Sequence, residues 1–188
     1  MENGVVNQVD PRIRRTRQLL QQALGKLLEK KDFNDISIQD IAEEATVNRA
    51  TFYDHYADKF VLLNCMVGCR FHALLAERQI QFEGSCRAEL KLIVRAVCDY
   101  LTRFEGGERR LEPPIESAII GAVREILLAG IRQHVPESAI RPEIMAASAS
   151  WAIFGAAKEW AQTPDRSPVE EIEDAVTAIV SPILQIPA

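Results

Sequence analysis

The chain has 188 residues, of which 47% are hydrophobic and 26% charged, a composition typical of a globular protein with one domain or two small ones. No apolar run approaches the roughly 18 residues that a membrane-spanning helix needs, and the first residues lack a secretory signal, so we expect a cytoplasmic protein without a membrane partner. The four cysteines show no CxxC spacing, and in a reducing compartment we expect them to be small core residues.

The net charge of −5 is unevenly distributed along the chain. From Arg12 to Lys31 there are seven basic residues and one acid, whereas beyond residue 60 there are 13 Lys and Arg against 17 Asp and Glu, a difference of −4. A basic segment attached to an acidic body is compatible with a polyanionic partner, because the neutralisation of phosphates is a local effect.

Helical periodicity runs through almost the whole chain, and we predict an all-α protein. The first helix covers about residues 13–30. The second begins at Ser37, which forms a capping box with Asp40, and the third follows a short turn with Asn48 as its N-cap. Asp58 caps a long fourth helix to about residue 76, and later helices cover about residues 87–104, 115–134, 142–161 and 168–184.

The second and third helices are joined by a three-residue turn, which predicts a helix-turn-helix. Phe52 and Tyr56 form the inward stripe of the third helix, so residues 49–51 and 53–55 face outward. Arginine pairs with a guanine edge, Thr and Ala methyls contact a thymine methyl, and Tyr, His and Lys59 bind phosphate oxygens. This surface therefore predicts contact with duplex DNA, and the alternative is that an aromatic-rich short helix belongs to a plain core.

The block ISIQDIAEEATVNRATFYDHYADKFVLL, residues 36–63, closely resembles the N-terminal domain of the TetR family of bacterial repressors, and the resemblance spans about residues 12–64. It implies an N-terminal arm and a three-helix DNA-binding head in residues 1–57, followed by a helical effector-binding and dimerisation domain in residues 58–188. The implied protein is a dimeric repressor that binds a palindromic operator and is released by a small-molecule effector. The implied DNA contacts are Ser37, Gln39, Arg49, Ala50, Thr51, Tyr53, His55 and Lys59.

Two positions depart from the family pattern. Thr46 stands where these proteins commonly have a glycine, so the turn must form without one. Asp54 occupies a position that is often basic, and it either pairs with Arg49 or accepts a hydrogen bond from a cytosine amino group. The flexible arm that family members often send toward DNA is expected at Arg12, Arg14, Arg15 and Arg17.

The last two helices combine an apolar stripe with small residues that permit close helix approach. We predict a twofold dimer interface there, and the alternative is that both stripes close a monomeric core. The predicted interface residues are Trp151, Gly155, Trp160, Ile172, Val176, Ile179 and Ile183. The predicted lining of a mostly apolar effector pocket is Phe71, His72, Cys98, Tyr100, Phe104, Val123, Met145, Trp151 and Phe154.

Other chemistries find little support in the sequence. Cys65, Cys69 and His72 share one helix face, where metal binding or redox sensing competes with core packing, and we predict no metal and no cofactor. No histidine follows a Glu at the di-iron spacing, and HExxH, GxSxG and phosphate-binding glycine loops are absent, so we predict no catalytic residues. The remaining rival is a helical adaptor that has lost DNA binding.

Overall fold

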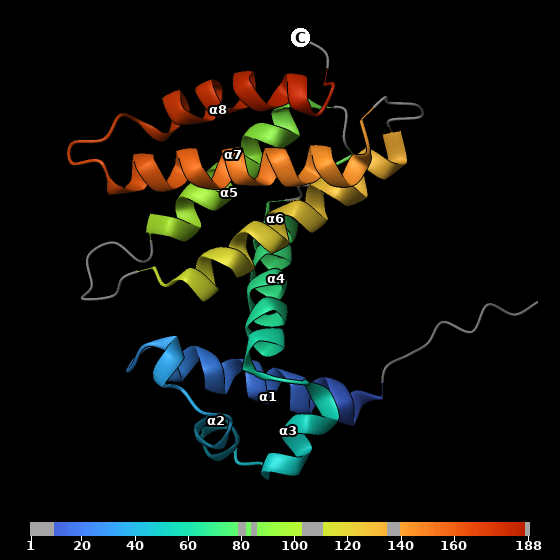
Figure 1. The fold of residues 1–188 in the computed structure, drawn as a ribbon, viewed down its shortest axis with the longest axis vertical. Helices are drawn as coiled ribbons and strands as arrows, with labels where there is room; N and C mark the ends of the chain where they lie inside the picture. Colours follow the sequence, from blue (N-terminus) through green and yellow to red (C-terminus); the bar gives the residue numbers. More distant parts are fainter. Residues whose placement is uncertain (1–9, 79–81, 84–85, 103–110, 135–139, 187–188) are drawn as a thin grey trace, which may run out of the picture. The chain divides into compact units, whose positions relative to one another are not determined.

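The computed structural model describes residues 10–78, 82–83, 86–102, 111–134 and 140–186, and the regular secondary structure within these ranges is helical (Figure 1). The predicted all-α fold is confirmed. The chain divides into two compact units, residues 1–66 and residues 67–188, which we call the N-terminal and C-terminal units.

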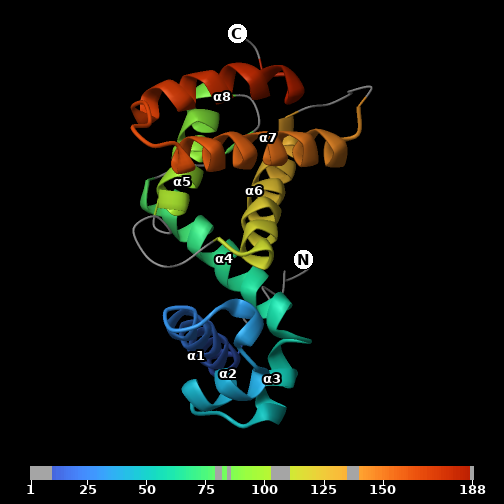
Figure 2. The same ribbon diagram turned by 60° about the vertical axis from the view of Figure 1, so that its left-hand side comes forward.

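The N-terminal unit is a small bundle around a fully buried apolar core (Figure 2). Its helices pack because their inward positions recur at helical spacing, as with Leu20 and Leu24 in the first helix. The inward residues of the following segments, Phe33, Ile41 and Phe52, complete this core. Its elements are α1 (Pro11–Leu27), the short 3-10 turn η1 (Phe33–Asp35), α2 (Ile38–Glu44), α3 (Arg49–His55) and the first two turns of α4 (Lys59–Glu77).

The start of α2 is fixed by the capping box that the sequence predicts. Ser37 Oγ accepts a hydrogen bond from the backbone N–H of Asp40 at 3.0 Å, and Asp40 Oδ2 accepts one from the backbone N–H of Ser37 at 2.7 Å. Hydrogen bonds from Ser37, followed by the ion pair with Lys31, lower the pKa of Asp40 to about 2. Two of the four orphan donors at this helix end are thereby satisfied reciprocally.

The turn between α2 and α3 places a threonine in the left-handed region. Thr46 has a φ of 57°, and the N–H groups of Thr46 and Val47 donate to the carbonyls of Glu43 and Ala42 at 3.0 and 2.9 Å. These two bonds form a Schellman motif, in which glycine is the usual residue at the position of Thr46. The turn therefore forms without glycine, at the cost of backbone strain in a β-branched residue.

Thr46→Gly is expected to raise the free energy of unfolding of the N-terminal unit by about 1 kcal/mol, because relief of the left-handed strain exceeds the entropy that glycine adds to the unfolded chain. Gln185, at φ 57° in the corresponding turn after the last helix, is a matched comparison. Gln185→Gly should give a smaller gain since glutamine is not β-branched. Chemical denaturation followed by circular dichroism measures both, and a loss of stability in Thr46→Gly would contradict the strain.

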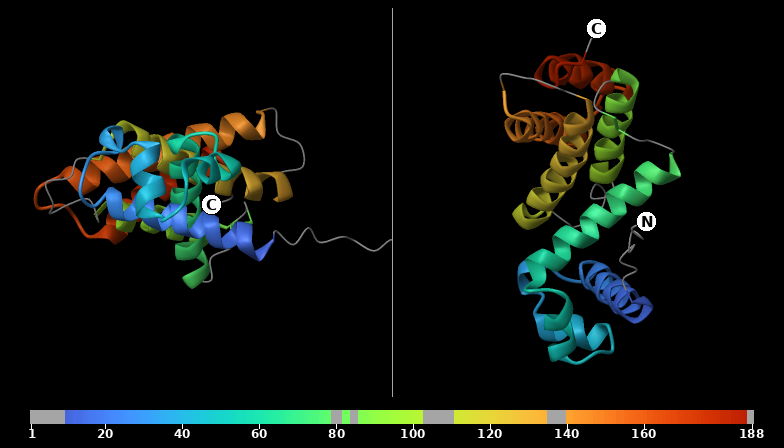
Figure 3. Two further views of the ribbon diagram at one scale, coloured as in Figure 1. Left: turned by 90° about the horizontal axis from the view of Figure 1, so that it is seen from below. Right: turned by 90° about the vertical axis from the view of Figure 1, so that its right-hand side faces the viewer.

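The C-terminal unit consists of packed helices in which α7 contacts α5, α6 and α8, and α5 contacts α8 (Figure 3). Their buried faces are almost entirely apolar, as in Ile93 of α5 and Ile153 of α7. The helices are α5 (Arg87–Leu101), α6 (Pro113–His134), α7 (Pro142–Gln162) and α8 (Val169–Ile183).

Basic side chains of α5 bind acidic side chains of α8 and set the register between the two helices. Arg95 donates to Glu170 at 2.7 Å and also to Glu173, and these hydrogen bonds raise the pKa of Arg95. Lys91 forms an ion pair with Asp174 one turn along. A shift of one helix along the other by a turn would separate these oppositely charged side chains. The ion pairs therefore favour the observed alignment of α5 with α8.

Among the described helices, α4 alone is long and apolar enough to cross a membrane by length and composition. Its sequence still holds no uninterrupted apolar run of about 18 residues, because Asn64, Arg70 and His72 interrupt it. A core helix of a soluble protein passes the same test, and one such helix is weak evidence for a membrane span. The first turns of α4 contribute the buried Leu62 and Leu63 to the N-terminal unit, which is the behaviour of a core helix.

Candidate nucleic-acid interface

Helix α3 buries one aromatic stripe and exposes a polar face, as the sequence predicts. Phe52 is 0% exposed and Tyr56 is buried, whereas Tyr53 is 47% exposed. On the same outward face Arg49, Ala50 and Asp54 are exposed, and Thr51 and His55 are half-buried. The predicted residues of α3 therefore lie together on one surface of the N-terminal unit.

Arg49 and Tyr53 form a stacked pair on this surface. The Arg49 Nη2 donates to the Tyr53 hydroxyl at 3.2 Å, and the guanidinium lies 5.6 Å from the centroid of the Tyr53 ring. The Tyr53 ring in turn meets the buried Phe52 ring edge to face, with 5.6 Å between the centroids. The arginine is thus held against a ring anchored to the core, with guanidinium hydrogens left for a further acceptor. This pair was not predicted from the sequence, although Arg49 and Tyr53 stand at the i, i+4 spacing at which helical side chains meet.

The structure shows the local partners of the polar side chains that flank this pair. Arg49 donates to Tyr53 rather than to Asp54, so the pairing of Asp54 with Arg49 is not what the structure forms. Asn48 Oδ1 accepts from both the N–H and the hydroxyl of Thr51, at 2.7 and 2.9 Å, and is the predicted N-cap of α3. The Thr51 methyl and hydroxyl oxygen are the groups left for a partner.

The predicted contacts at the start of α2 already have intramolecular partners. The Ser37 hydroxyl donates to Asp40 Oδ2 at 2.7 Å, and Gln39 Nε2 donates to Glu43 Oε1 at 2.7 Å. Both side chains are exposed, so they are accessible, but each lies beside a carboxylate that repels phosphate. Their contact with DNA stays a prediction.

Lys59 has partners within the N-terminal unit that were not predicted from the sequence. Its Nζ donates to the backbone carbonyls of Phe33, Asn34 and Ile36 at 2.9, 3.0 and 2.7 Å. These three bonds use all the hydrogens of an ammonium group. The contact of Lys59 with a phosphate stays a prediction.

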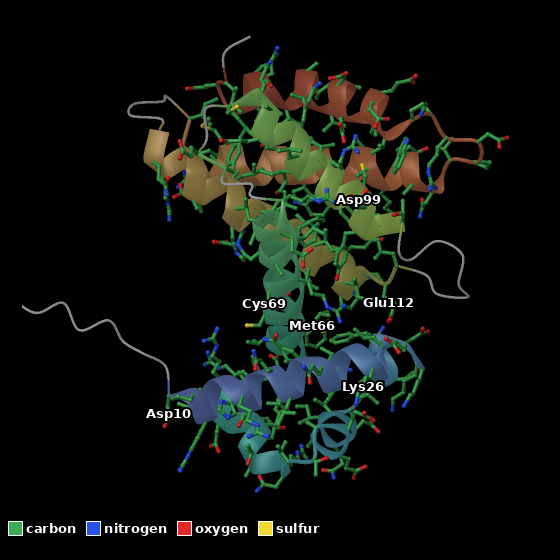
Figure 4. All side chains as sticks on the ribbon, turned by 180° about the vertical axis from the view of Figure 1, so that it is seen from behind. Asp10, Lys26, Met66, Cys69, Asp99 and Glu112 are labelled. Atoms are coloured by element: carbon green, nitrogen blue, oxygen red, sulfur yellow. The ribbon has the colours of Figure 1, made fainter. Side chains whose placement is uncertain are left out.

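The arginines that the sequence places in a flexible arm are helical. Arg12, Arg14, Arg15 and Arg17 lie in α1, whose N-cap Asp10 accepts from the Arg12 N–H at 2.8 Å. Figure 4 shows Asp10 at the start of α1 and Lys26 toward its end. All four arginines are exposed and make the start of α1 basic, and residues 1–9 lie outside the described residues.

The predicted effector-pocket residues divide by exposure. His72 and Trp151 are exposed, Trp151 by 63%, so they lie outside the buried core, and their place in a pocket stays a prediction. Phe104 lies outside the described residues. Burial raises the pKa of the Cys98 thiol to about 12, which makes it a core group and not a reactive thiolate. The buried members are Phe71, Cys98, Tyr100, Val123, Met145 and Phe154.

The predicted dimer residues also divide by exposure. Trp151 and Gly155 of α7 and Ile179 of α8 are exposed, Ile179 by 62%, while Trp160, Ile172 and Ile183 are half-buried. Val176 is only 1% exposed, so it packs inside the C-terminal unit and was wrongly assigned to an interface. Val176 and Ile179 are three residues apart and therefore neighbours on α8, but Val176 lies on the buried side of that stripe and Ile179 on its exposed side.

No group of three potential metal ligands occurs among the described residues, which include Cys65, Cys69 and His72. Cys65 and Cys69 are exposed, contrary to the prediction that they pack in a core. Figure 4 shows the Cys69 side chain projecting away from α4.

Comparison with known proteins agrees with this geometry. Residues 20–65 match the model of the family described as bacterial regulatory proteins, tetR family. The chain is 51% identical over 61 residues to an HTH-type transcriptional regulator of Bacillus subtilis (strain 168), YxbF, whose own function is uncharacterised. That match covers 32% of this chain, and the chain spans only 16% of the length of the relative.

Solved structures share the fold over most of the chain. A TetR transcriptional regulator from Streptococcus agalactiae 2603V has 22% identity and a TM-score of 0.54, covering 91% of this chain and 96% of its own. FadR, a TetR-family repressor from Thermus thermophilus solved with lauroyl-CoA, has 20% identity and a TM-score of 0.54, covering 87% and 92%. RolR, solved with resorcinol, has 14% identity and a TM-score of 0.53, covering 94% and 97%.

These regulators are not enzymes. At identities of 14 to 22%, the similarity of the solved structures supports the fold alone. The family match carries the assignment, because it falls on the segment that builds α2, the Thr46 turn and α3. Residues 20–65 therefore form a helix-turn-helix domain of the tetR-family type.

Proposed function

We propose that the chain is a sequence-specific transcriptional regulator, a dimeric repressor that leaves a palindromic operator when a small-molecule effector binds. The observation that carries this proposal is the exposed Arg49–Tyr53 pair on α3 of a tetR-family domain. In a helix-turn-helix the second helix enters the major groove with its N-terminal residues at the base edges, and Arg49 is the first residue of α3.

The functional division follows the order of the helices. We assign DNA binding to residues 1–57, and effector binding and dimerisation to residues 58–188, in the cytoplasm. Ser37, Gln39, Ala50, Thr51 and His55 are the further candidates for DNA contact. The exposed arginines of α1 support a phosphate-binding surface beside α3, since such contacts supply most non-specific affinity.

Selection of bound duplexes from a random pool by the purified chain tests this function. We expect recovery of a palindrome whose half-sites are spaced by about one helical turn of DNA. Recovery of no sequence at low salt, from a chain that circular dichroism shows to be folded, would contradict the proposal. It would favour the helical adaptor.

The exposed apolar stripe of α7 and α8 supports dimerisation. Trp151 and Ile179 are large hydrophobic side chains that a monomer would leave in water, and exposed apolar patches of this kind mark interaction sites. Gly155 follows Trp151 by four residues on α7. The half-buried Ile172 and Ile183 stand seven residues before and four residues after Ile179 on α8, at helical spacing.

Trp151→Glu is expected to convert the dimer to a monomer, because it places a charge in a desolvated apolar contact. Leu92, which is 38% exposed on α5, provides the matched control, and Leu92→Glu should leave the dimer intact. Sedimentation velocity measures both variants. A wild-type monomer, or a dimer that survives Trp151→Glu, would contradict the assigned interface.

The apolar interior of the C-terminal unit supports an organic effector. Phe71 and Tyr100 stack there with 4.9 Å between ring centroids, beside a core that is almost free of charge. The lauroyl-CoA of FadR and the resorcinol of RolR support small organic ligands as a class and favour no single one. Since α4 contributes residues to both units, a ligand that prefers one position of α4 would change DNA affinity by its differential binding.

A further inference from the structure

Lys59, the first residue of α4, is bonded to three carbonyl oxygens of the segment that precedes α2. The acceptors are the carbonyls of Phe33, Asn34 and Ile36, at distances of 2.9, 3.0 and 2.7 Å from Nζ. We call this arrangement the Lys59 cage. Hydrogen bonds from an ionised donor at these distances are about twice as strong as neutral ones. The cage therefore ties the start of α4 to a segment more than 20 residues earlier in the chain.

Aromatic rings flank the cage. The ammonium nitrogen lies 4.8 Å from the ring centroid of Phe33 and 5.9 Å from that of Phe60, both within the range of cation–π attraction. The two rings meet edge to face with 5.2 Å between centroids, and Phe33 is 0% exposed. Lys59 itself is half-buried. Its charge is accordingly engaged and partly screened from solvent on the side of the rings.

One peptide group connects the cage to the recognition helices. The Ile36 carbonyl, which accepts from Lys59, and the Ser37 N–H, which donates to Asp40 Oδ2 at 2.7 Å, belong to the same peptide plane. That plane is therefore held at both ends immediately before the first turn of α2. Helix α2 then leads through the two-bond turn at Thr46 into α3, so this peptide is the point from which the helix-turn-helix begins.

We propose that Lys59 is a positioning residue for DNA recognition, which fixes the peptide before α2 and does not neutralise a phosphate. This inference rests on the proposed function. Moving Nζ to a phosphate would take a charged donor away from three backbone carbonyls, of which that of Phe33 also accepts from the Ile36 N–H at 3.2 Å. Losing such a donor is costly where the carbonyl is shielded from water. The short distances to all three carbonyls favour the internal role.

Two substitutions separate positioning from phosphate contact. Lys59→Met removes the charge and the cage together. Lys59→Arg keeps a charge that binds phosphate, but its donors lie on three nitrogens in one plane and cannot converge on three carbonyls as one ammonium does. Lys30→Met, an exposed lysine of the same unit, is the control for simple loss of a charge.

The probe is the duplex selected by the wild-type chain, titrated at several salt concentrations and at a temperature where each variant is folded. We expect both Lys59 variants to bind the duplex about tenfold more weakly. That loss corresponds to about one molecule in ten having α2 and α3 in the arrangement that binds DNA. The salt slope should stay that of wild type, and amide hydrogens of Ser37 and Asp40 should exchange faster. Lys30→Met should leave amide exchange unchanged.

Two results would overturn the inference. A salt slope lower by about 0.9 in Lys59→Met, with affinity restored in Lys59→Arg, would assign Lys59 to a phosphate. Unchanged affinity and exchange in both variants would show that Lys59 positions nothing. If the wild-type chain selects no duplex, the proposed function fails by itself, and amide exchange still decides whether Lys59 fixes the start of α2.

Discussion

Phe52→Ala is expected to lower the free energy of unfolding of the N-terminal unit by about 3–5 kcal/mol, the usual cost of truncating a buried phenylalanine. Phe52 is 0% exposed and its ring contacts those of Tyr53 and Tyr56, with centroid distances of 5.6 and 6.1 Å. Its loss leaves a cavity between α3 and the rest of the core. In a unit this small, that cost is a large part of the total stability.

Two probes make the Phe52 result specific to one unit. Both tryptophans, Trp151 and Trp160, lie in the C-terminal unit, so their fluorescence reports that unit, whereas circular dichroism reports both. We expect an earlier transition in dichroism with a tryptophan transition close to wild type. Tyr53→Ala, at a 47% exposed neighbour, should cost less than about 1 kcal/mol. Equal costs for the two variants would contradict the assignment of Phe52 as a core residue.

Arg49→Ala is expected to weaken binding to the selected duplex by about 1–3 kcal/mol. It should also relax the sequence preference at one base pair in each half-site, where we expect Arg49 to contact a guanine. The pair with Tyr53 pre-orients the guanidinium, so Tyr53→Ala should weaken binding as well. Repeating the duplex selection with each variant measures the preference directly.

The control for Arg49 is Arg124→Ala, which removes the same charge from an exposed position on α6 of the C-terminal unit. It should leave the base preference unchanged. Persistence of the wild-type preference in Arg49→Ala would show that Arg49 does not read a base, and would shift specificity to the other exposed positions of α3.

Local signals in the sequence predicted the N-terminal unit well. The capping box of Ser37, the N-cap at Asn48 and the cap at Asp58, which accepts from the N–H groups of Phe60 and Val61, all join residues two to three apart. Signals that involve residues so close together can be recognised in the sequence itself. The start of α1 was misplaced although Asp10 and Pro11 are a cap followed by proline at the first position.

Contacts between distant residues account for what the sequence did not reveal. The cage joins Lys59 to carbonyls 23 to 26 residues away, and no side-chain pattern marks a backbone acceptor. In the C-terminal unit, α7 packs on three helices, so apolar residues occur around most of its circumference. Periodicity alone therefore could not place Trp151 of α7 at the surface. On α8 the buried Val176 and the exposed Ile179 are only three residues apart, so they fall within one predicted stripe.

The affinity of the chain for its selected duplex, compared with a scrambled duplex of equal composition at two salt concentrations, tests the central claim most directly. We expect the affinities for both duplexes to fall steeply with salt, and the selected duplex to be preferred by about a thousandfold or more at physiological salt. Equal affinities for the two duplexes, or no binding at low salt by a folded chain, would contradict the claim that α3 reads DNA sequence.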